Sequence, residues 1–366
     1  MTRVLKTLLI ILFALSAFTF QLKASDEHAG ADTVSTGKFS TGELIFSHIK
    51  DSYEWHITKI GHTHISIPLP VILYSQQSGI HVFMSGKFHH GTETYQGFKI
   101  ATEGKYARKI VEVMADGTEV KPWDISITKN VTSLFLSILI ILLIFISVAK
   151  RYSDNFARAP KGLQNWIEPI IIFIRDDIAK PSLGNKNYQK FLPYLLTIFF
   201  FIFINNVMGL IPFFPGGANL TGDITVTLVL AIFTFTITTI NGSRDYWVHM
   251  VNAPGIPWWL KLPLPLMPIV EILSVFIKPF VLTIRLFANI TAGHIIALGF
   301  YSLIFIFAEK SAAAAYSVSV ISVAFNVFMG ILELLVAFIQ AYVFTLLSAI
   351  YIGMAMESHE VHAETH

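Results

Sequence analysis

Long apolar runs separated by short polar segments fill the chain from about residue 131 onward. The runs 131–149, 191–211 and 224–240 each approach the length of a membrane-spanning helix. Two further runs, 269–307 and 312–356, are much longer. Because strands show period-two alternation and these runs do not, the pattern predicts an all-α polytopic membrane domain with about five crossings.

The two last apolar runs are too long for an upright helix. At 1.5 Å per residue the first would extend about 58 Å, whereas the hydrocarbon core is about 30 Å thick. Either each run breaks into two spans, with bends at Pro279 and Gly330, or both lie steeply tilted as a hairpin. No polar loop interrupts either run, so we expect a tilted hairpin whose turn contains Glu309 and Lys310.

Charged residues between the runs predict the orientation. The segment 163–179 carries several charges and is expected to lie at the interface rather than to span. Lysines and arginines cluster after the first run and around Arg244, whereas the loop 212–223 has none. By the positive-inside rule that loop faces outside, and the tail 357–366 is cytoplasmic.

The first part of the chain is different in character. Residues 1–24 contain two basic residues followed by an apolar run and small residues, which is typical of a cleaved signal peptide, although an uncleaved anchor remains an alternative. Residues 25–128 are polar, with alternating stretches between Gly and Asp punctuation. This pattern predicts a small β-rich extracytoplasmic region ahead of a membrane domain spanning 129–356.

Histidines are concentrated in that N-terminal region. Imidazole is a common metal ligand, but the spacing matches no metal motif. Solvated surface histidines are therefore the preferred interpretation over a metal site. The residues concerned are His28, His48, His56, His62, His64, His81, His89 and His90.

Composition supports the membrane assignment. The chain of 366 residues is 54% hydrophobic and only 14% charged, whereas soluble domains carry about 25% charged residues. The net charge of +2 gives no support to a nucleic-acid role, and the absence of cysteine excludes disulfides and thiol catalysis. No phosphate-binding glycine loop is present, so no nucleotide cofactor or catalytic activity is expected.

Polar residues recur along one face of each long apolar run. Residues seven apart return to nearly the same side of a helix. Two such stripes on neighbouring helices resemble the walls of an ion path. The first stripe contains Glu271, Lys278, Arg285 and Asn289, and the second contains Asn326, Glu333 and Gln340.

Arg285 is the most informative of these residues. It lies far from both ends of its run, so its side chain cannot easily reach the interface. A cation there costs about 2.5–3.5 kcal/mol on insertion scales, and arginine cannot lose its proton to avoid this cost. One alternative is a structural ion pair with Glu271 or Glu333. The other is a functional cation that repels protons or attracts a carboxylate on another subunit.

His294 is predicted to lie on the opposite face of the same helix from Arg285. Its imidazole can accept and release a proton near neutral pH. Glu333 on the neighbouring helix is the expected partner, so a proton relay is preferred over a simple helix contact.

Three motifs, in order, resemble the signatures of F-type ATP synthase subunit a. They are Asn206-Val-Met-Gly-Leu-Ile-Pro212, the run Arg285-Leu-Phe-Ala-Asn289 followed by Ala292-Gly293, and Gln340-Ala-Tyr-Val-Phe344. The resemblance covers about residues 130–356. The region before residue 128 lies outside the family core, so the resemblance leaves its role open.

The resemblance implies the roles of individual residues. Arg285 would face the rotating c-ring, hold its carboxylate and separate two half-channels, with Gln340 across from it. Asn289 and Glu271 match polar positions of the access paths. Many bacterial members have Glu at the position of His294 and His at the position of Glu333, so this chain has the acid and the imidazole at exchanged positions. Protons would enter near Asp223, His294 and Glu333 and leave past Glu271.

On this hypothesis the chain is a non-catalytic, proton-translocating subunit in a bacterial inner membrane. It would assemble with c subunits, stator subunit b and the rest of the synthase, and the histidine favours protons over sodium. Two other classes remain open. A stand-alone channel or transporter would conduct when purified alone, and a structural scaffold would tolerate neutral replacements along both stripes.

Overall fold

The computed structural model describes Gly42 and residues 50–357, except 61–62, 103, 115, 155–159, 161, 212–215 and 252–265. The side chains of residues 56–65, 249–251 and 266–272 also lie outside this description. The chain divides into two compact units, one of residues 1–38 and 59–64, the other of residues 39–58 and 65–366. Every contact discussed below lies in the second unit. The predicted signal segment 1–24 and most of the predicted tail 357–366 lie outside the described residues.

The predicted β-rich N-terminal region is confirmed. It contains a two-stranded sheet and two antiparallel three-stranded sheets, ordered β4-β3-β8 and β5-β6-β7. Alternation buries Val71 and Leu73 of β3 against Phe88 and Phe98. The elements are β1 Glu54–Ile60, β2 Thr63–Pro68, β3 Pro70–Ser75, β4 Gly79–Met84, a 3-10 helix Ser85–Gly91, β5 Phe98–Ile100, β6 Ile110–Val113, β7 Glu119–Val120 and β8 Trp123–Asp124.

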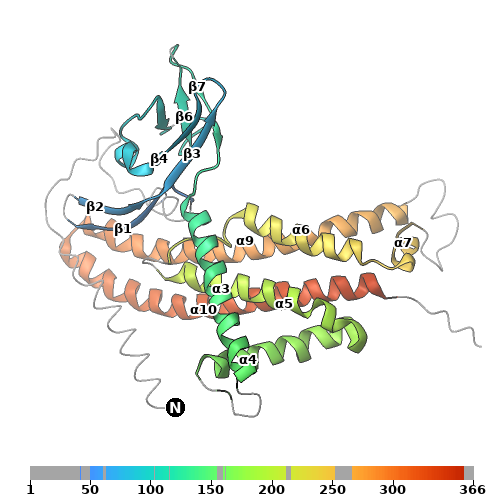
Figure 1. The fold of residues 1–366 in the computed structure, drawn as a ribbon. Coiled ribbons are helices and arrows are strands. Elements are labelled where there is room, and N and C mark those ends of the chain that lie inside the picture. Colours follow the sequence, from blue (N-terminus) through green and yellow to red (C-terminus); the bar gives the residue numbers. More distant parts are fainter. Residues whose placement is uncertain are drawn as a thin grey trace, which may run out of the picture. The chain divides into compact units, whose positions relative to one another are not determined.

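Helices form the remainder of the described chain (Figure 1). Four are long and apolar enough to cross a membrane, and the shorter α6 is also apolar, which agrees with the predicted five crossings. The elements are α3 Lys129–Asp154, α4 Leu163–Phe173, a π-helical segment Ile174–Ala179, α5 Lys180–Leu210, α6 Ile224–Ile240, α7 Arg244–Val251, α9 Leu266–Ala308 and α10 Ala312–Met356.

The segment expected at the interface, 163–179, forms α4 and the π-helical segment. It continues into α5 through a sharp bend at Gly184, where φ is 73° and ψ is 162°. A side chain rarely adopts that conformation, so glycine permits the chain to fold back here. Arg175 and Lys180 both form ion pairs with Asp176, at 2.8 and 2.7 Å. The charges that made this segment unsuitable for an isolated span are thus partly paired with one another.

The predicted hairpin of long helices is confirmed. Helices α9 and α10 contain 43 and 45 residues and lie side by side (Figure 1). Neither Pro279 nor Gly330 ends its helix. Ser311 begins α10 by accepting a hydrogen bond from the Ala314 backbone N–H at 3.2 Å. At about 1.5 Å per residue each helix is about 65 Å long, so both must tilt strongly in a bilayer.

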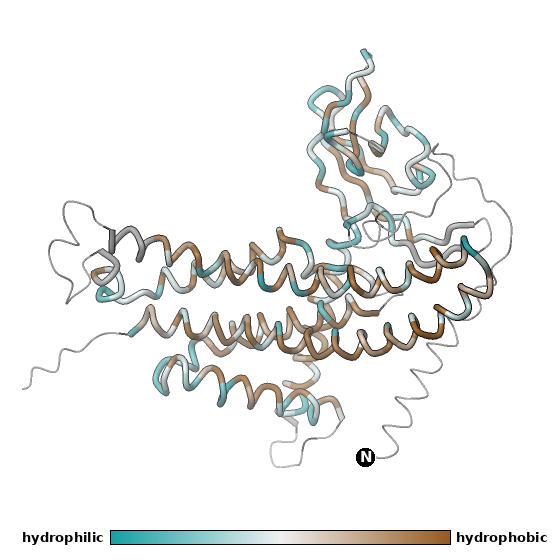
Figure 2. Tube along the Cα trace, turned by 180° about the vertical axis from the view of Figure 1, so that it is seen from behind, coloured by the Kyte–Doolittle hydropathy of each residue, from teal (hydrophilic) through white to brown (hydrophobic). Residues whose placement is uncertain are grey.

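The core of the membrane domain joins α5, α9 and α10. Phe199 and Phe200 of α5, Leu282 and Leu286 of α9, and Phe344 of α10 are all nearly inaccessible. Hydrophobic positions predominate along these helices (Figure 2), and α9 and α10 also expose many large apolar side chains. Helices that are apolar on all sides are typical of membrane proteins, because lipid covers the faces that the core does not.

Candidate functional site

A cavity of about 330 Å³ lies among α5, α9 and α10. Most of its wall is apolar, but five polar side chains converge on it. They are Asn206 from α5, Asn289 and His294 from α9, and Glu333 and Gln340 from α10. Such convergence of polar and ionisable groups inside a membrane domain is the usual mark of an ion or substrate pathway.

Two glycines lie beside the ionisable groups of this cavity. A Cβ on Gly293 would lie 2.8 Å from Glu333 Oε1, so glycine leaves room for the carboxylate in its present position. A Cβ on Gly209 of α5 would lie 3.7 Å from His294 Nε2, which places the imidazole against this helix. Glu333 Oε1 is buried and has no hydrogen-bond partner among the described residues. A water molecule or a transferred proton would satisfy it.

Asn206 connects the cavity to the loop before α6. Its amide nitrogen donates a hydrogen bond to the Ala337 carbonyl of α10 at 3.2 Å, and its oxygen accepts one from the Thr221 hydroxyl. Both residues are buried. Sequence reasoning did not assign Asn206 or Thr221 to the site, although two adjacent asparagines in the apolar run 191–211 were a usable signal.

Arg285 lies outside the cavity lining, on an exposed part of α9 beside the buried Leu286. Among the described residues it forms no ion pair with a carboxylate. The expected alternative of a structural pair with Glu333 is therefore not seen, and the side chain of Glu271 lies outside the described residues. Arg285 interacts electrostatically with the Tyr351 hydroxyl of α10.

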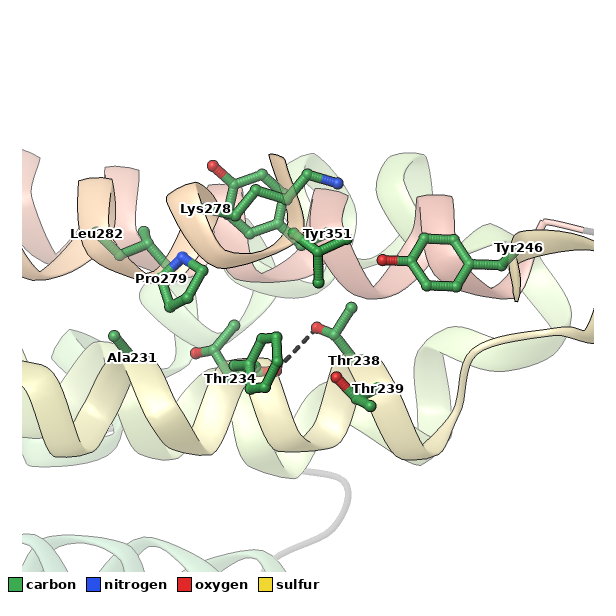
Figure 3. A pocket seen from close by; sticks show the side chains of 11 residues that line it. Ala231, Thr234, Thr238, Thr239, Tyr246, Lys278, Pro279, Leu282 and Tyr351 are labelled. Carbon is green, nitrogen blue, oxygen red and sulfur yellow. Dashed lines mark hydrogen bonds between the residues drawn. The ribbon is translucent and has the colours of Figure 1, made fainter. Parts of the chain in front are cut away.

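A second, smaller cavity of about 10 Å³ lies among α6, α9, α10 and Tyr246 of α7 (Figure 3). The Lys278 ammonium lies over the Tyr351 ring, 5.4 Å from its centroid. On the α6 side the Thr238 hydroxyl donates to the Thr234 carbonyl at 2.8 Å. The volume suffices for about one water molecule. This cavity is thus a narrow, partly polar space on the Lys278 side of Arg285.

Asp223 has a structural role at the start of α6. Its Oδ1 accepts a hydrogen bond from the Thr225 backbone N–H at 2.9 Å, the usual arrangement at a helix N-terminus. Its Oδ2 accepts a bond from the Asn130 amide at 3.3 Å. Asp223 does not line the main cavity, but the loop that contains it is linked to Asn206 through Thr221.

The structure thus brings four of the expected site residues into one cavity: Asn289, His294, Glu333 and Gln340. No direct hydrogen bond joins His294 to Glu333 among the described contacts, so a relay between them would need a bridging group. Asn289, expected on the same helix face as Arg285, lines this cavity together with His294, whereas Arg285 does not.

The histidines of the N-terminal region do not gather into a metal site among the described residues. His90 lies 2.7 Å from a carboxylate oxygen of Glu54, and His89 lies 3.6 Å from Glu93. His81 shares a hydrogen bond with Gln96 at 2.9 Å. His28, His48 and His62 lie outside the described residues.

Comparisons with known proteins agree with the geometry. A family model described as ATP synthase A chain matches residues 131–353, and a domain of unknown function matches residues 44–129. The chain is 45% identical to ATP synthase subunit a 2 of Chlorobaculum tepidum, over 69% of this chain and 70% of the relative. It is 43% identical to ATP synthase subunit a of Chloroherpeton thalassium, over 67% and 71% respectively.

Proposed function

Because this chain belongs to the ATP synthase A chain family, we propose that it carries protons to and from a rotating c-ring through two half-channels separated by Arg285. The family assignment makes it the proton-translocating subunit of the membrane sector, a multi-pass membrane protein with a place in the synthase complex. The two half-channels and the contact with the ring are the proposal.

The positions of the two cavities support this division. Along α9 the smaller cavity is lined by Lys278, Pro279 and Leu282, and the larger one by residues 289–296. Arg285 lies between these two stretches. A fixed cation between two water-accessible spaces raises the energy of a proton that passes directly from one to the other.

The observation that carries the proposal is the exposed, unpaired state of Arg285 within the described chain. A guanidinium at mid-membrane costs about 2.5–3.5 kcal/mol, and no described carboxylate of this chain offsets that cost. One and two turns further along α9 the exposed residues Ala288 and Ala292 are small, which lets a neighbouring helix approach closely there. A carboxylate on a ring of c subunits fits this surface.

The remaining residues then take specific roles. The larger cavity opens to the outer half-channel. In it His294 and Glu333 accept and release protons, and the amides of Asn289 and Gln340 line the same space. The smaller cavity beside Lys278 and the predicted path past Glu271 belong to the inner half-channel. Asp223 lies towards the outer entrance.

The proposed setting is a bacterial inner membrane, with the N-terminal region outside and the C-terminus in the cytoplasm. Stator subunit b and the rest of the F-type synthase are the expected partners. The chain itself breaks no bond and needs no cofactor in this mechanism.

The direct test is Arg285→Ala in the complete synthase, measured as proton-driven ATP synthesis in membrane vesicles. We expect coupled synthesis to be lost while the complex still assembles. Ile284→Ala, an exposed neighbour that carries no charge, is the matched control and should keep normal synthesis. Retained coupled synthesis in Arg285→Ala would exclude the assigned role. Co-purification with a ring of small subunits separates this function from a channel that acts alone.

A further inference from the structure

The first turn of α3 is held by residues of the N-terminal region. Asp51 Oδ1 accepts a hydrogen bond from the Asn130 backbone N–H at 3.0 Å, and the Ser52 carbonyl accepts one from the Lys129 backbone N–H at 2.9 Å. An anion at a helix N-terminus also interacts favourably with the helix dipole. The N-terminal region therefore fixes where the first membrane helix begins.

This turn also contacts the loop before α6. The Asn130 side chain donates to Asp223 Oδ2 at 3.3 Å. The preceding residue of the loop, Gly222, packs so closely against Asn219 that a Cβ would lie 2.1 Å from the amide. Thr291 of α9 donates a hydrogen bond to the Gly222 carbonyl at 3.5 Å. The start of α3, the loop 219–223 and α9 thus meet in one polar cluster.

Several polar atoms in the first turns of α3 and in the loop 219–223 are buried without a hydrogen-bond partner among the described residues. They are the Asn130 amide oxygen, the Ser133 hydroxyl and both amide atoms of Asn219. The side chains concerned are at least nine-tenths buried, and Ser133 is only 1% exposed. Buried polar groups in proteins are nearly always hydrogen-bonded, and water is the usual partner where protein groups are absent. This cluster therefore has the chemistry of a hydrated space.

The cluster is linked to the larger cavity by a hydrogen bond. Thr221 of the same loop donates to Asn206, which lines the cavity. Lys129, the first residue of α3, is also buried. One hydrogen-bonded route, from Asn130 through the loop 221–223 to Asn206, thus connects the start of α3 to the polar lining of the cavity.

We propose that the first turns of α3 and the loop 219–223 line a hydrated vestibule, through which protons reach the larger cavity from outside. In this vestibule Asn130 is a positioning residue that holds Asp223, and Ser133 and Asn219 bind water. The N-terminal region, through Asp51 and Ser52, keeps the vestibule in place. This inference rests on the proposed proton-channel function and extends it to α3 and the N-terminal region, to which that proposal assigns no part in transport.

Because the chain contains no cysteine, a single introduced thiol is unique in it. We would reconstitute the complete synthase with Ser133→Cys or Asn219→Cys and add a cationic, membrane-impermeant methanethiosulfonate from the outer side. Leu139→Cys is the control, since Leu139 lies on α3 with 51% of its surface exposed, on a face suited to lipid. Labelling is read by the mass of this chain, and ATP-driven proton transport is measured before and after.

We expect both vestibule cysteines to react and proton transport to fall about tenfold or more, whereas the lipid-facing cysteine stays unlabelled. Asn130→Ala should lower transport several-fold at normal assembly, and Asn130→Gln, which keeps the amide donor, should restore part of it. Inert thiols at both positions, or labelling that leaves transport unchanged, would overturn the vestibule. The Arg285→Ala variant, measured in the same preparation, separates the two proposals. If it abolishes coupled synthesis while the vestibule cysteines stay unlabelled, only the vestibule is overturned and the proposed function stands.

Discussion

Replacement of Gly293 by alanine is a small change that acts directly on the proposed proton path. The new methyl group would lie 2.8 Å from Glu333 Oε1 and 3.4 Å from both Cγ and Cδ of that side chain. Ordinary van der Waals contacts of a Cβ atom begin at 3.4 Å. The carboxylate must therefore withdraw by about 0.6 Å, the difference between 3.4 and 2.8 Å.

This movement should lower the rate of proton flow more than it lowers the stability of the fold. The atom in closest contact is the end of a flexible side chain, so the carboxylate can turn away without displacing α10. Alanine also favours a helix over glycine by about 0.5–1 kcal/mol, which offsets the strain. A misplacement of about 1 Å can lower the rate of a positioned reaction about 100-fold. For about 0.6 Å we expect proton flow to fall on the order of tenfold.

The same helix provides a matched control. Gly299 has no heavy atom within 4 Å of the position that a Cβ would take, so Gly299→Ala tests the gain in helix propensity alone. Both variants should assemble with equal or slightly raised thermal stability, and only Gly293→Ala should lose ATP-driven proton pumping in inverted vesicles. Equal pumping by the two variants would show that the position of the Glu333 carboxylate does not limit proton flow.

Three further predictions concern individual contacts. Phe199→Ala should destabilise the membrane domain by about 3 kcal/mol or more, because Phe199 is fully buried; thermal unfolding in detergent measures this. Asp223→Ala should cost about 1 kcal/mol by removing the bond to the Thr225 N–H, and Asp223→Ser should recover most of it in the same assay. Burial, together with the hydrogen bond to Asp124, raises the pKa of Tyr53 above its ordinary value of about 10. The contribution of Tyr53 to stability is complete below about pH 10 and is lost as the pH rises above that value. Limited proteolysis of the N-terminal region should therefore become faster above about pH 10, and this increase should be smaller in Tyr53→Phe.

The bounds of the membrane helices were largely predictable because local signals mark them. The predicted runs 224–240 and 312–356 coincide with α6 and α10. In both cases a residue that accepts a backbone hydrogen bond, Asp223 or Ser311, stands directly before an apolar run. Such signals depend only on neighbouring residues, so a single sequence contains them.

The packing of the helices could not be predicted in the same way. In α9 and α10 apolar residues occur on every side (Figure 2), so hydrophobicity does not show which face meets a neighbour. The placement of Asn289 in the cavity beside His294 depends on the path of α5 past α9. The seven-residue spacing singled out polar residues on two helices, but it could not say which of them share one space.

The separation of Arg285 from Glu333 bears on the functional classes that the sequence left open. If Arg285 had only a structural role, a partner within the chain would be its natural complement, because a buried pair costs less than an unpaired charge. Glu333 is available on the adjacent helix, yet it lies in the cavity while Arg285 is exposed beside it. A fold that holds both groups and keeps them apart loses the stabilisation that pairing would provide. A counter-ion on another subunit would restore that stabilisation, so the absence of a described partner in this chain supports the proposed rotary assembly over a scaffold or a channel that acts alone.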